Sequence, residues 1–387
     1  MSRKSIWSVT ALLFALMMVS QTVAQAPAQK AQQQGAAAAK PAGNLPGEFT
    51  LVSKADIAKV QKAIDDGLAN DEPVRTVNIS NRYNLGVYTL NSQPPGAKPG
   101  GPVMGFYHND IAEVYIIASG SGTWRVGGEL EDPKNDDLTS RGVKEIRGPG
   151  VVGILKGYTD QKITTGDVLI VPPGVPHSPG VFLETTKIIR VVIDPHKVLP
   201  LYPPTVQNAS AQAPKTTAAV KPAPNLPGTF TFISKAEIDK TLKELEVPGT
   251  YGDRAVRTVD LPAINYRLGV YVLHTAQMPK APKGPATSGW YHTSIAELYY
   301  FIRGAGTFVI GGSLENPTAD DPDSYSTKMV RGPSVSGTFK GATEVKYEAG
   351  DVLIAPTGVP HIPGQTTAAP RDIMRIAIDP DKVLPLK

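Results

Sequence analysis

The feature that most constrains this chain is an internal repeat. The stretch NLPGEFTLVSKADI, which starts at Asn44, returns as NLPGTFTFISKAEI from Asn225, and matching runs follow in the same order to VIDPHKVLPL and AIDPDKVLPL. Through the centre of each copy the offset is a constant 184 positions, as from His108 to His292, so neither copy carries an insertion there. A repeat of this length predicts one domain that has been duplicated.

Two domains are therefore predicted, at residues 44–201 and 225–387. Domains commonly hold about 100–200 residues, which agrees with this division. The segments 25–43 and 202–224 are rich in Ala, Pro, Gln and Thr and contain almost no large apolar side chains. Such segments cannot bury enough apolar surface to fold, so we predict disordered linkers.

Residues 1–24 have the pattern of a signal peptide. Arg3 and Lys4 precede an apolar stretch from Ile6 to Val19, and small residues allow cleavage after Ala24. A membrane anchor is the competing interpretation, but the apolar stretch is shorter than the roughly 20 residues that span a bilayer. We therefore expect a periplasmic or secreted protein that is not attached to a membrane once the signal is cleaved.

Composition limits the chemistry that the chain can use. There is no Cys, which excludes disulfides, thiolate ligands and Cys nucleophiles, so a metal site must be built from His and oxygen donors. The formal net charge is +4, and Lys and Arg are scattered among Asp and Glu. Because no basic strip forms, nucleic acid is not an expected partner.

The order of local patterns predicts the fold class. Each copy opens with a Ser followed three positions later by an acid, Ser53 with Asp56 and Ser234 with Glu237, which is the spacing of a helix capping box. Short β-rich runs such as LGVYTL, AEVYIIA and DVLIVP follow, separated by Gly, Pro and Asn or Asp turns. This pattern favours a short helix and then a β-sandwich or barrel. The stretches after Gly127 and Gly311 are expected to form surface loops near a barrel mouth.

Four of the six histidines form two matched pairs. His108 and His177 in the first copy correspond to His292 and His361 in the second. Each early His is followed five residues later by a Glu, and each late His follows a Gly-Asp, an apolar run and a Pro-x-Gly turn.

These residues resemble the two signature motifs of the cupin family. The first motif, His-x4-Glu-x6-Gly, is matched by HNDIAEVYIIASG and HTSIAELYYFIRG. The second, Gly-x5-Pro-x-Gly-x2-His, is matched from Gly166 to His177 and from Gly350 to His361. The resemblance covers the core of each copy but not the linkers or the opening helix. It implies an all-β protein of two tandem double-stranded β-helix (jelly-roll) barrels, each with one divalent metal. The capping pattern adds a short N-terminal helix to each barrel.

The first motif departs from the family pattern at one position. The family commonly has a further His two residues before the matched one, whereas this chain has Phe106 and Trp290 there. Because strand neighbours two apart share a face, both aromatic side chains should face the same interior as the remaining His. The metal ligands that the resemblance leaves are His108, Glu113 and His177 in the first domain and His292, Glu297 and His361 in the second.

Two His and one carboxylate leave the identity of the metal open. The set suits non-haem iron with free coordination positions, and equally zinc with three protein ligands and a water. Mn and Ni also remain candidates, and an impaired site is a further alternative.

Other repeated polar residues are candidate functional groups. Tyr115 and Tyr299 follow each Glu by two positions and should project beside the ligands as proton donors or acceptors, unless they are core residues with a single hydrogen bond. Three pairs of cations also recur: Arg147 with Arg331, Lys156 with Lys340, and Arg190 with Arg375. Each would bind a substrate carboxylate, or else lie at a solvated sheet edge or form a structural ion pair, and Arg190 and Arg375 lie in apolar strands where a charge needs a partner.

The function expected is that of a metal-dependent enzyme acting on a small oxygenated organic substrate, as a dioxygenase, a decarboxylase or lyase, or an isomerase. The alternative is a non-catalytic bicupin that binds or stores a small ligand. A chain in which one copy works while the other stabilises it is a third interpretation, and an oligomer remains open.

Overall fold

The structure is a computed structural model that describes residues 48–66, 71–92, 102–203, 230–246, 252–277 and 286–387. The expected signal peptide (1–24), the linker 25–43 and nearly all of the linker 202–224 lie outside the described residues. All described residues belong to one unit, 39–387. Among them, no helix has both the length and the apolar character needed to cross a membrane.

Each copy begins with the expected short helix. Helix α1 (Lys54–Asp65) has a complete capping box, in which the Ser53 hydroxyl accepts from the amide of Asp56 and the Asp56 carboxylate accepts from the amide of Ser53. Helix α2 (Lys235–Leu245) has only the first half of this box, from Ser234. The reciprocal contact expected from Glu237 is missing because that carboxylate pairs with Arg257 instead.

The first module is a sandwich of two six-stranded antiparallel sheets. One sheet has the order β13-β10-β5-β12-β3-β2 and the other β7-β8-β4-β11-β6-β9. Side chains of both sheets, including Tyr115 and Trp124, pack into one buried cluster, so the sheets face each other. The strands are β2 (Asp71–Ile79), β3 (Tyr83–Ser92), β4 (Met104–His108), β5 (Ala112–Ser119), β6 (Ser121–Val126), β7 (Glu129–Asn135), β8 (Gly150–Lys156), β9 (Thr159–Thr164), β10 (Val168–Val171), β11 (His177–Phe182), β12 (Thr186–Asp194) and β13 (Thr231–Ile233).

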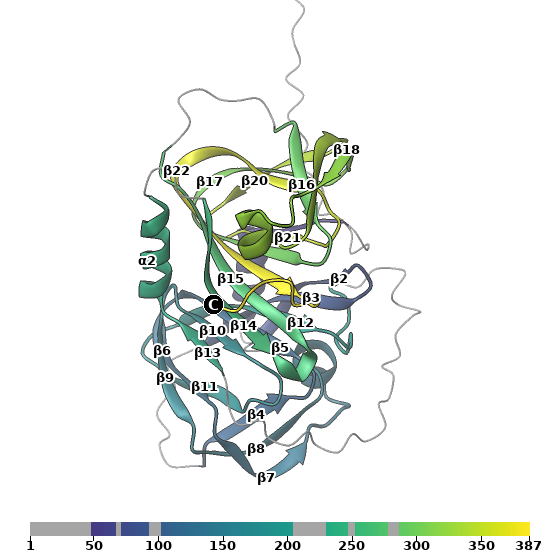
Figure 1. The fold of residues 1–387 in the computed structure, drawn as a ribbon. Helices are drawn as coiled ribbons and strands as arrows, with labels where there is room; N and C mark the ends of the chain where they lie inside the picture. Colours follow the sequence, from purple (N-terminus) through teal and green to yellow (C-terminus); the bar gives the residue numbers. More distant parts are fainter. Residues whose placement is uncertain (1–47, 67–70, 93–101, 204–229, 247–251, 278–285) are drawn as a thin grey trace, which may run out of the picture. The chain divides into compact units, whose positions relative to one another are not determined.

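The second module repeats this sandwich with longer strands. Its strands β17 and β22 run through both layers and join them into one ten-stranded sheet. In the first module two separate strands take the place of each of these long strands. Figure 1 shows β22, in yellow, as one long bent ribbon. The strands are β1 (Thr50–Val52), β14 (Asp253–Leu261), β15 (Tyr266–Thr275), β16 (Ser288–His292), β17 (Ala296–Ile310), β18 (Ser313–Ala319), β19 (Ser334–Lys340), β20 (Thr343–Glu348), β21 (Val352–Ala355) and β22 (His361–Asp379). The predicted fold class, two double-stranded β-helix barrels each with a short helix, is confirmed.

The two modules exchange their first strands. Strand β1 precedes the first module in sequence but pairs with β21 of the second, and β13 pairs with β10 of the first. The Asp of each Gly-Asp motif completes the exchange: Asp351 accepts from the amide of Lys54, and Asp167 accepts from that of Lys235. Apolar side chains of both modules also share one buried cluster, so the modules stabilise each other.

The stretches expected to be surface loops are partly strands. Residues after Gly127 and Gly311 form β7 and β18, whose backbones pair with β8 and β19 while most of their side chains stay exposed. Each is followed by a short π-helical segment, Gly142–Arg147 or Thr327–Arg331. The polar composition of these two stretches is that of exposed edge strands, which pair with a neighbour on one side only.

The closing motif of the first copy depends on a buried carboxylate. Asp194 is 1% exposed and accepts from the backbone amides of Val198 and Leu199, at 3.0 and 2.8 Å. Burial raises the pKa of Asp194 from 3.8 to about 6, although these amides act in the opposite direction. The proton is therefore held more tightly in the folded chain than in the unfolded chain.

This raised pKa predicts a gain in stability at mildly acidic pH. Its contribution is fully present below the unfolded pKa and is lost as pH rises through about 6, so lowering pH from 7 to 5 should raise the free energy of unfolding by about 1 kcal/mol from Asp194 alone. Urea unfolding at each pH measures it, with Asp194→Asn as the control that should lack this component. An identical pH profile in the variant would contradict the assignment.

Candidate metal centre

Each sandwich encloses one of the two predicted ligand groups. In the first module His108 ends β4 and His177 begins β11 in one sheet, while Glu113 comes from β5 in the facing sheet. Their ligand atoms all lie within 4.8 Å of one another, and the three residues are 2%, 0% and 0% exposed. The structure therefore brings the sequence-predicted residues together between the sheets. His292, Glu297 and His361 form the same group in the second module.

The Pro-x-Gly turn of the second motif connects the two histidine-bearing segments. Gly174 has a positive φ of 77°, which glycine adopts without strain, and its amide donates to the carbonyl oxygen of His108 at 2.8 Å. Gly358 does the same for His292, with φ at 82° and a distance of 3.0 Å. The turn thus fixes the backbone of the early His relative to the late one.

The carboxylate of Glu113 is contacted on both oxygens. The Arg190 guanidinium donates to Oε1 at 2.5 Å, and the Tyr115 hydroxyl donates to Oε2 at 2.6 Å. The Nε2 atoms of His108 and His177 lie 3.2 and 3.1 Å from the two oxygens. Although burial by itself raises the pKa of Glu113, His108 and Arg190 hold that pKa well below its usual value, so the group is a carboxylate.

The second module repeats these contacts. Arg375 and Tyr299 donate to the two oxygens of Glu297, and the Nε2 atoms of His292 and His361 lie 3.1 and 2.9 Å from Oε2. The arrangement is therefore a property of the repeated fold.

The late histidines are held with Nε2 directed at the Glu. The Nδ1 atom of His177 lies 2.9 Å from the carbonyl oxygen of Val175, and that of His361 lies 2.8 Å from the carbonyl oxygen of Val359. A carbonyl only accepts, so Nδ1 carries a proton and Nε2 is the nitrogen that faces the carboxylate. A backbone carbonyl on the second nitrogen is a common partner of metal-binding His.

The early histidines give the clearest test of whether a metal fits. The Nε2 atoms of His108 and His292 are buried and have no hydrogen-bond partner in the part of the chain that the structure describes. Burial lowers the pKa of both rings, which favours their neutral forms. A proton could join the Glu to only one imidazole, whereas a cation would satisfy all three facing groups. The residues present therefore fit a divalent metal.

The two sites differ behind the early His. His292 Nδ1 lies 2.9 Å from Ser334 Oγ, and that hydroxyl donates onward to the carbonyl of Gly332 at 3.0 Å. The hydroxyl therefore accepts from Nδ1 and keeps Nε2 free for a ligand. Gly150 occupies the Ser334 position in the first module, opposite His108, whose Nδ1 has no hydrogen-bond partner among the described residues.

This difference predicts that the second site binds metal more tightly. Replacing Ser334 by Ala should weaken metal binding there by about tenfold, because partners behind a metal-binding His commonly contribute about 10–100-fold. Competition with a coloured chelator measures the affinity. The compared chains all carry His177→Ala as well, so that only metal bound at the second site contributes. Ser336→Ala, on the same strand, is the control. Equal affinities of the Ser334→Ala chain and its parent would contradict the role.

Arg190 and Arg375 are buried in structural ion pairs, one of the alternatives that the sequence left open. Besides Glu113, Arg190 contacts Asp71 at 2.9 Å and lies over the ring of Tyr88, with 4.4 Å from Cζ to the centroid. Burial opposes the charge of Arg190, but Asp71 and Glu113 outweigh burial and raise its pKa. Burial also raises the pKa of Asp71 to about 6.

In the second module Asp253 takes the place of Asp71, at 3.0 Å from Arg375. Sequence reasoning missed both Asp residues. Their equivalent positions at the start of β2 and β14 were the available signal.

The aromatic residues lie where strand alternation predicted them. The ring of Phe106 is 4.5 Å from that of His177 and 5.4 Å from that of His108, between centroids. Trp290 lies farther from its His361, at 6.3 Å. Tyr115 and Tyr299 are 3% exposed and point at the Glu, and burial raises the pKa of each well above its usual value. Their placement agrees with the expectation, whereas their catalytic role stays a prediction.

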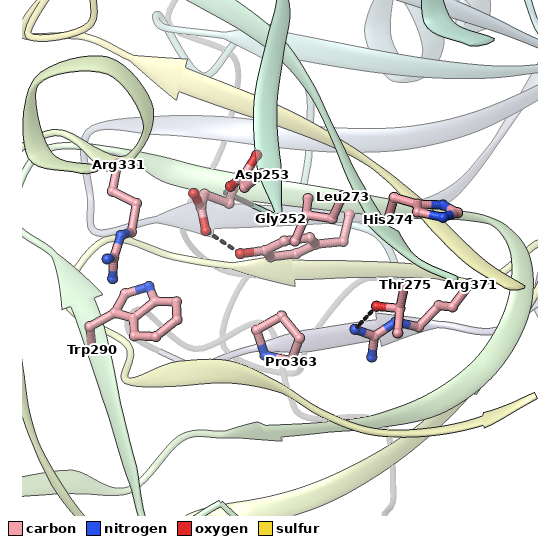
Figure 2. A pocket seen from close by; sticks show the side chains of 11 residues that line it. Gly252, Asp253, Leu273, His274, Thr275, Trp290, Arg331, Pro363 and Arg371 are labelled. Atoms are coloured by element: carbon pink, nitrogen blue, oxygen red, sulfur yellow. Dashed lines mark hydrogen bonds between the residues drawn. The ribbon is translucent and has the colours of Figure 1, made fainter. Parts of the chain in front are cut away.

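A cavity of about 220 Å³ opens beside the second group. Glu297 and Tyr299 form part of its lining. Figure 2 shows Arg331 and Trp290 on one side of the cavity and Arg371 with Thr275 on the other. Arg371 was not among the sequence-predicted residues.

Facing sheets that enclose a buried group of two His and one Glu define a jelly-roll protein with candidate metal sites. This unit occurs twice, and each copy carries the two sequence motifs that resemble those of the cupin family, so the chain contains two such modules.

The solved structures to which this chain is similar share little sequence identity with it. No protein-family model matches the chain, and a search of curated proteins finds no relative. A solved structure of salicylate 1,2-dioxygenase from Pseudoaminobacter salicylatoxidans with gentisate is 12% identical, with a TM-score of 0.48 over 86% of this chain and 81% of that one. Oxalate decarboxylase from Bacillus subtilis is 14% identical, with a TM-score of 0.36 over 78% and 69%. Similarity this low transfers neither activity nor substrate.

Proposed function

We propose that each module binds one divalent metal through its two His and one Glu, and that the chain is an enzyme acting on a small oxygenated organic substrate. The observation that carries the proposal is at His108 and His292, whose buried imidazole Nε2 atoms face a carboxylate and have no hydrogen-bond partner among the residues that the structure describes. Fe, Mn, Zn and Ni all suit this donor set.

When bound, a divalent metal supplies a Lewis acid that polarises a substrate oxygen, and a redox-active metal also supplies oxidation chemistry. The protein's own groups prepare the site in the second module. Arg375 and Tyr299 fix both oxygens of Glu297, and Val359 fixes the ring of His361. The cavity beside Glu297 gives a substrate access to the site, and the Tyr299 hydroxyl lines that cavity as a hydrogen-bonding group.

The reaction types that fit are a dioxygenase, a decarboxylase or lyase, and an isomerase. The test combines elemental analysis of the purified full chain with oxygen-uptake and turnover assays on carboxylic acids, sugars and phenols. Stoichiometric metal with turnover of one class supports the proposal. A chain that takes up no metal when it is offered each of the four would refute it.

A second candidate function is a non-catalytic bicupin that binds a small ligand. Phe106 favours it for the first module, because its ring lies against both histidines where the family commonly has a further ligand. Retained metal with no turnover on the same substrates would favour this alternative. A mixed result, in which only His361→Ala abolishes turnover, would assign catalysis to the second module.

We also propose that the chain is exported to the periplasm or secreted, on the basis of the signal-like pattern of residues 1–24. Fractionation of cells that express the full chain, with N-terminal sequencing of the product, tests this. A mature chain that begins near Gln25 outside the cytoplasm is expected, and an uncleaved cytoplasmic chain would refute the proposal.

A further inference from the structure

The cavity of the second module contains a buried cation that has no anionic partner among the described residues. Arg371 lines this cavity and is 8% exposed. Its guanidinium donates to three neutral oxygens, the Thr275 hydroxyl at 2.8 Å, the Tyr347 hydroxyl at 3.0 Å and the Gly364 carbonyl at 3.4 Å. Within the described parts of the chain it forms no ion pair.

The adjacent carboxylate does not neutralise Arg371. Asp372 is occupied by Arg303 and by His274, whose Nδ1 lies 2.6 Å from Oδ1. Arg375, four residues along the same strand, provides the contrast, because it contacts both Glu297 and Asp253. A buried charge is costly unless it is paired, so the position of Arg371 favours an anion supplied from the cavity.

A second guanidinium of the cavity is also weakly paired. In the first module Arg147 contacts Asp136 at 2.6 Å. The equivalent Arg331 lies 4.0 Å from Asp320, whose other oxygen accepts from the Ser336 hydroxyl. Arg331 lies over the ring of Trp290 with 4.2 Å from Cζ to the centroid, closer than the 5.6 Å between Arg147 and Phe106, on the side of the cavity opposite Arg371 (Figure 2).

The first module has no equivalent of Arg371. The register of β12 against β3 and of β22 against β15 places Thr186 at the Arg371 position and Ser92 at the Thr275 position. The Tyr347 position is Ile163, opposite a Gly in both modules. The cation and a hydroxyl that orients it are therefore particular to the second module.

We propose that the second module binds a small organic dicarboxylate, with one carboxylate on Arg371 and the other beside Arg331 and the Glu297 group. The inference rests on the proposed function for the place of the reaction, since Glu297 lines the same cavity. A cavity of about 220 Å³ suits a short-chain acid. Guanidinium groups bind carboxylates with two parallel hydrogen bonds, so Arg371 is the residue that sets specificity.

Calorimetric titration of the full chain tests the proposal. The probes are malonate, succinate and glutarate, with butyrate and 1,4-butanediol as matched ligands of lower charge. At least one dicarboxylate should bind more tightly than butyrate, and the diol should not bind. Arg371→Thr, which installs the residue found in the first module, should weaken dicarboxylate binding at least about tenfold. Lys340→Thr, the same charge change at an exposed position, should leave binding unchanged.

The controls separate this inference from the proposed metal site. Metal content measured on the same samples should be equal in Arg371→Thr and the parent chain. Metal-loaded protein that binds no dicarboxylate, or that binds it equally well after Arg371→Thr, would refute the inference alone. Binding that depends on Arg371 in a chain unable to take up metal would refute the proposed function alone. If Arg371→Thr does not fold, Arg371→Lys replaces it, and undiminished binding in that variant would overturn the role of the guanidinium.

Discussion

Replacing His361 by Ala is expected to lower the metal content of the chain from about two ions to about one, and His177→Ala should remove the other. Each change takes away one of only three protein ligands and leaves a carboxylate with its Arg and Tyr partners, which can no longer enclose a cation. The double variant should hold almost none. Elemental analysis after identical loading and gel filtration measures the loss.

The control for these variants is His196→Ala. His196 has 61% of its side chain exposed, faces Asp110 at 3.7 Å and lies outside both ligand groups, so its replacement should leave metal content unchanged. Chelation provides an independent measurement: removal of metal should lower the Tm of the parent chain and leave that of the double variant unaffected. Full metal content in the double variant would show that these histidines are not ligands.

The repeat and the two motifs were sufficient to predict the barrels and the position of the ligand groups. Motif spacing corresponds to a physical contact, because the turn glycine that precedes each late His donates its amide to the carbonyl of the early His. Period-two alternation also placed Phe106 and Tyr115 beside the ligands. The domain boundaries, the identity of the metal and the catalytic role of the tyrosines stay predictions.

The strand exchange could not be predicted because the two copies are so alike. Strands β1 and β13 come from nearly identical sequences, and so do their partners β21 and β10. Pairing within a copy and pairing between copies therefore satisfy the same hydrophobic pattern.

Arg371 was missed for the opposite reason. Comparison of the copies highlights residues that recur, and Thr186 stands at this position in the first copy. Ser334 was hidden in the same way, since its counterpart is Gly150. The residues that distinguish the two modules are thus the ones that a search for repetition passes over.

Replacing Arg375 by Met should strongly destabilise the second module, with a loss of about 3–5 kcal/mol in the free energy of unfolding. Arg375 is 1% exposed and is paired with Glu297 and Asp253, so its removal leaves two carboxylates without their cation. Urea unfolding of metal-free protein measures the loss.

The matched control is Arg254→Met in the same module, where the pair with Glu244 is 30% and 44% exposed. Exposed pairs contribute about 0–1 kcal/mol, so this change should have little effect. Added metal should restore more stability to the Arg375→Met chain than to the parent, because a bound cation would compensate the charge of Glu297 that Arg375 no longer neutralises. If metal-free Arg375→Met were as stable as Arg254→Met, Glu297 would have to be protonated or hydrated in the folded chain. The buried pair of Arg375 with Glu297 would then contribute no more to stability than the exposed pair of Arg254 with Glu244.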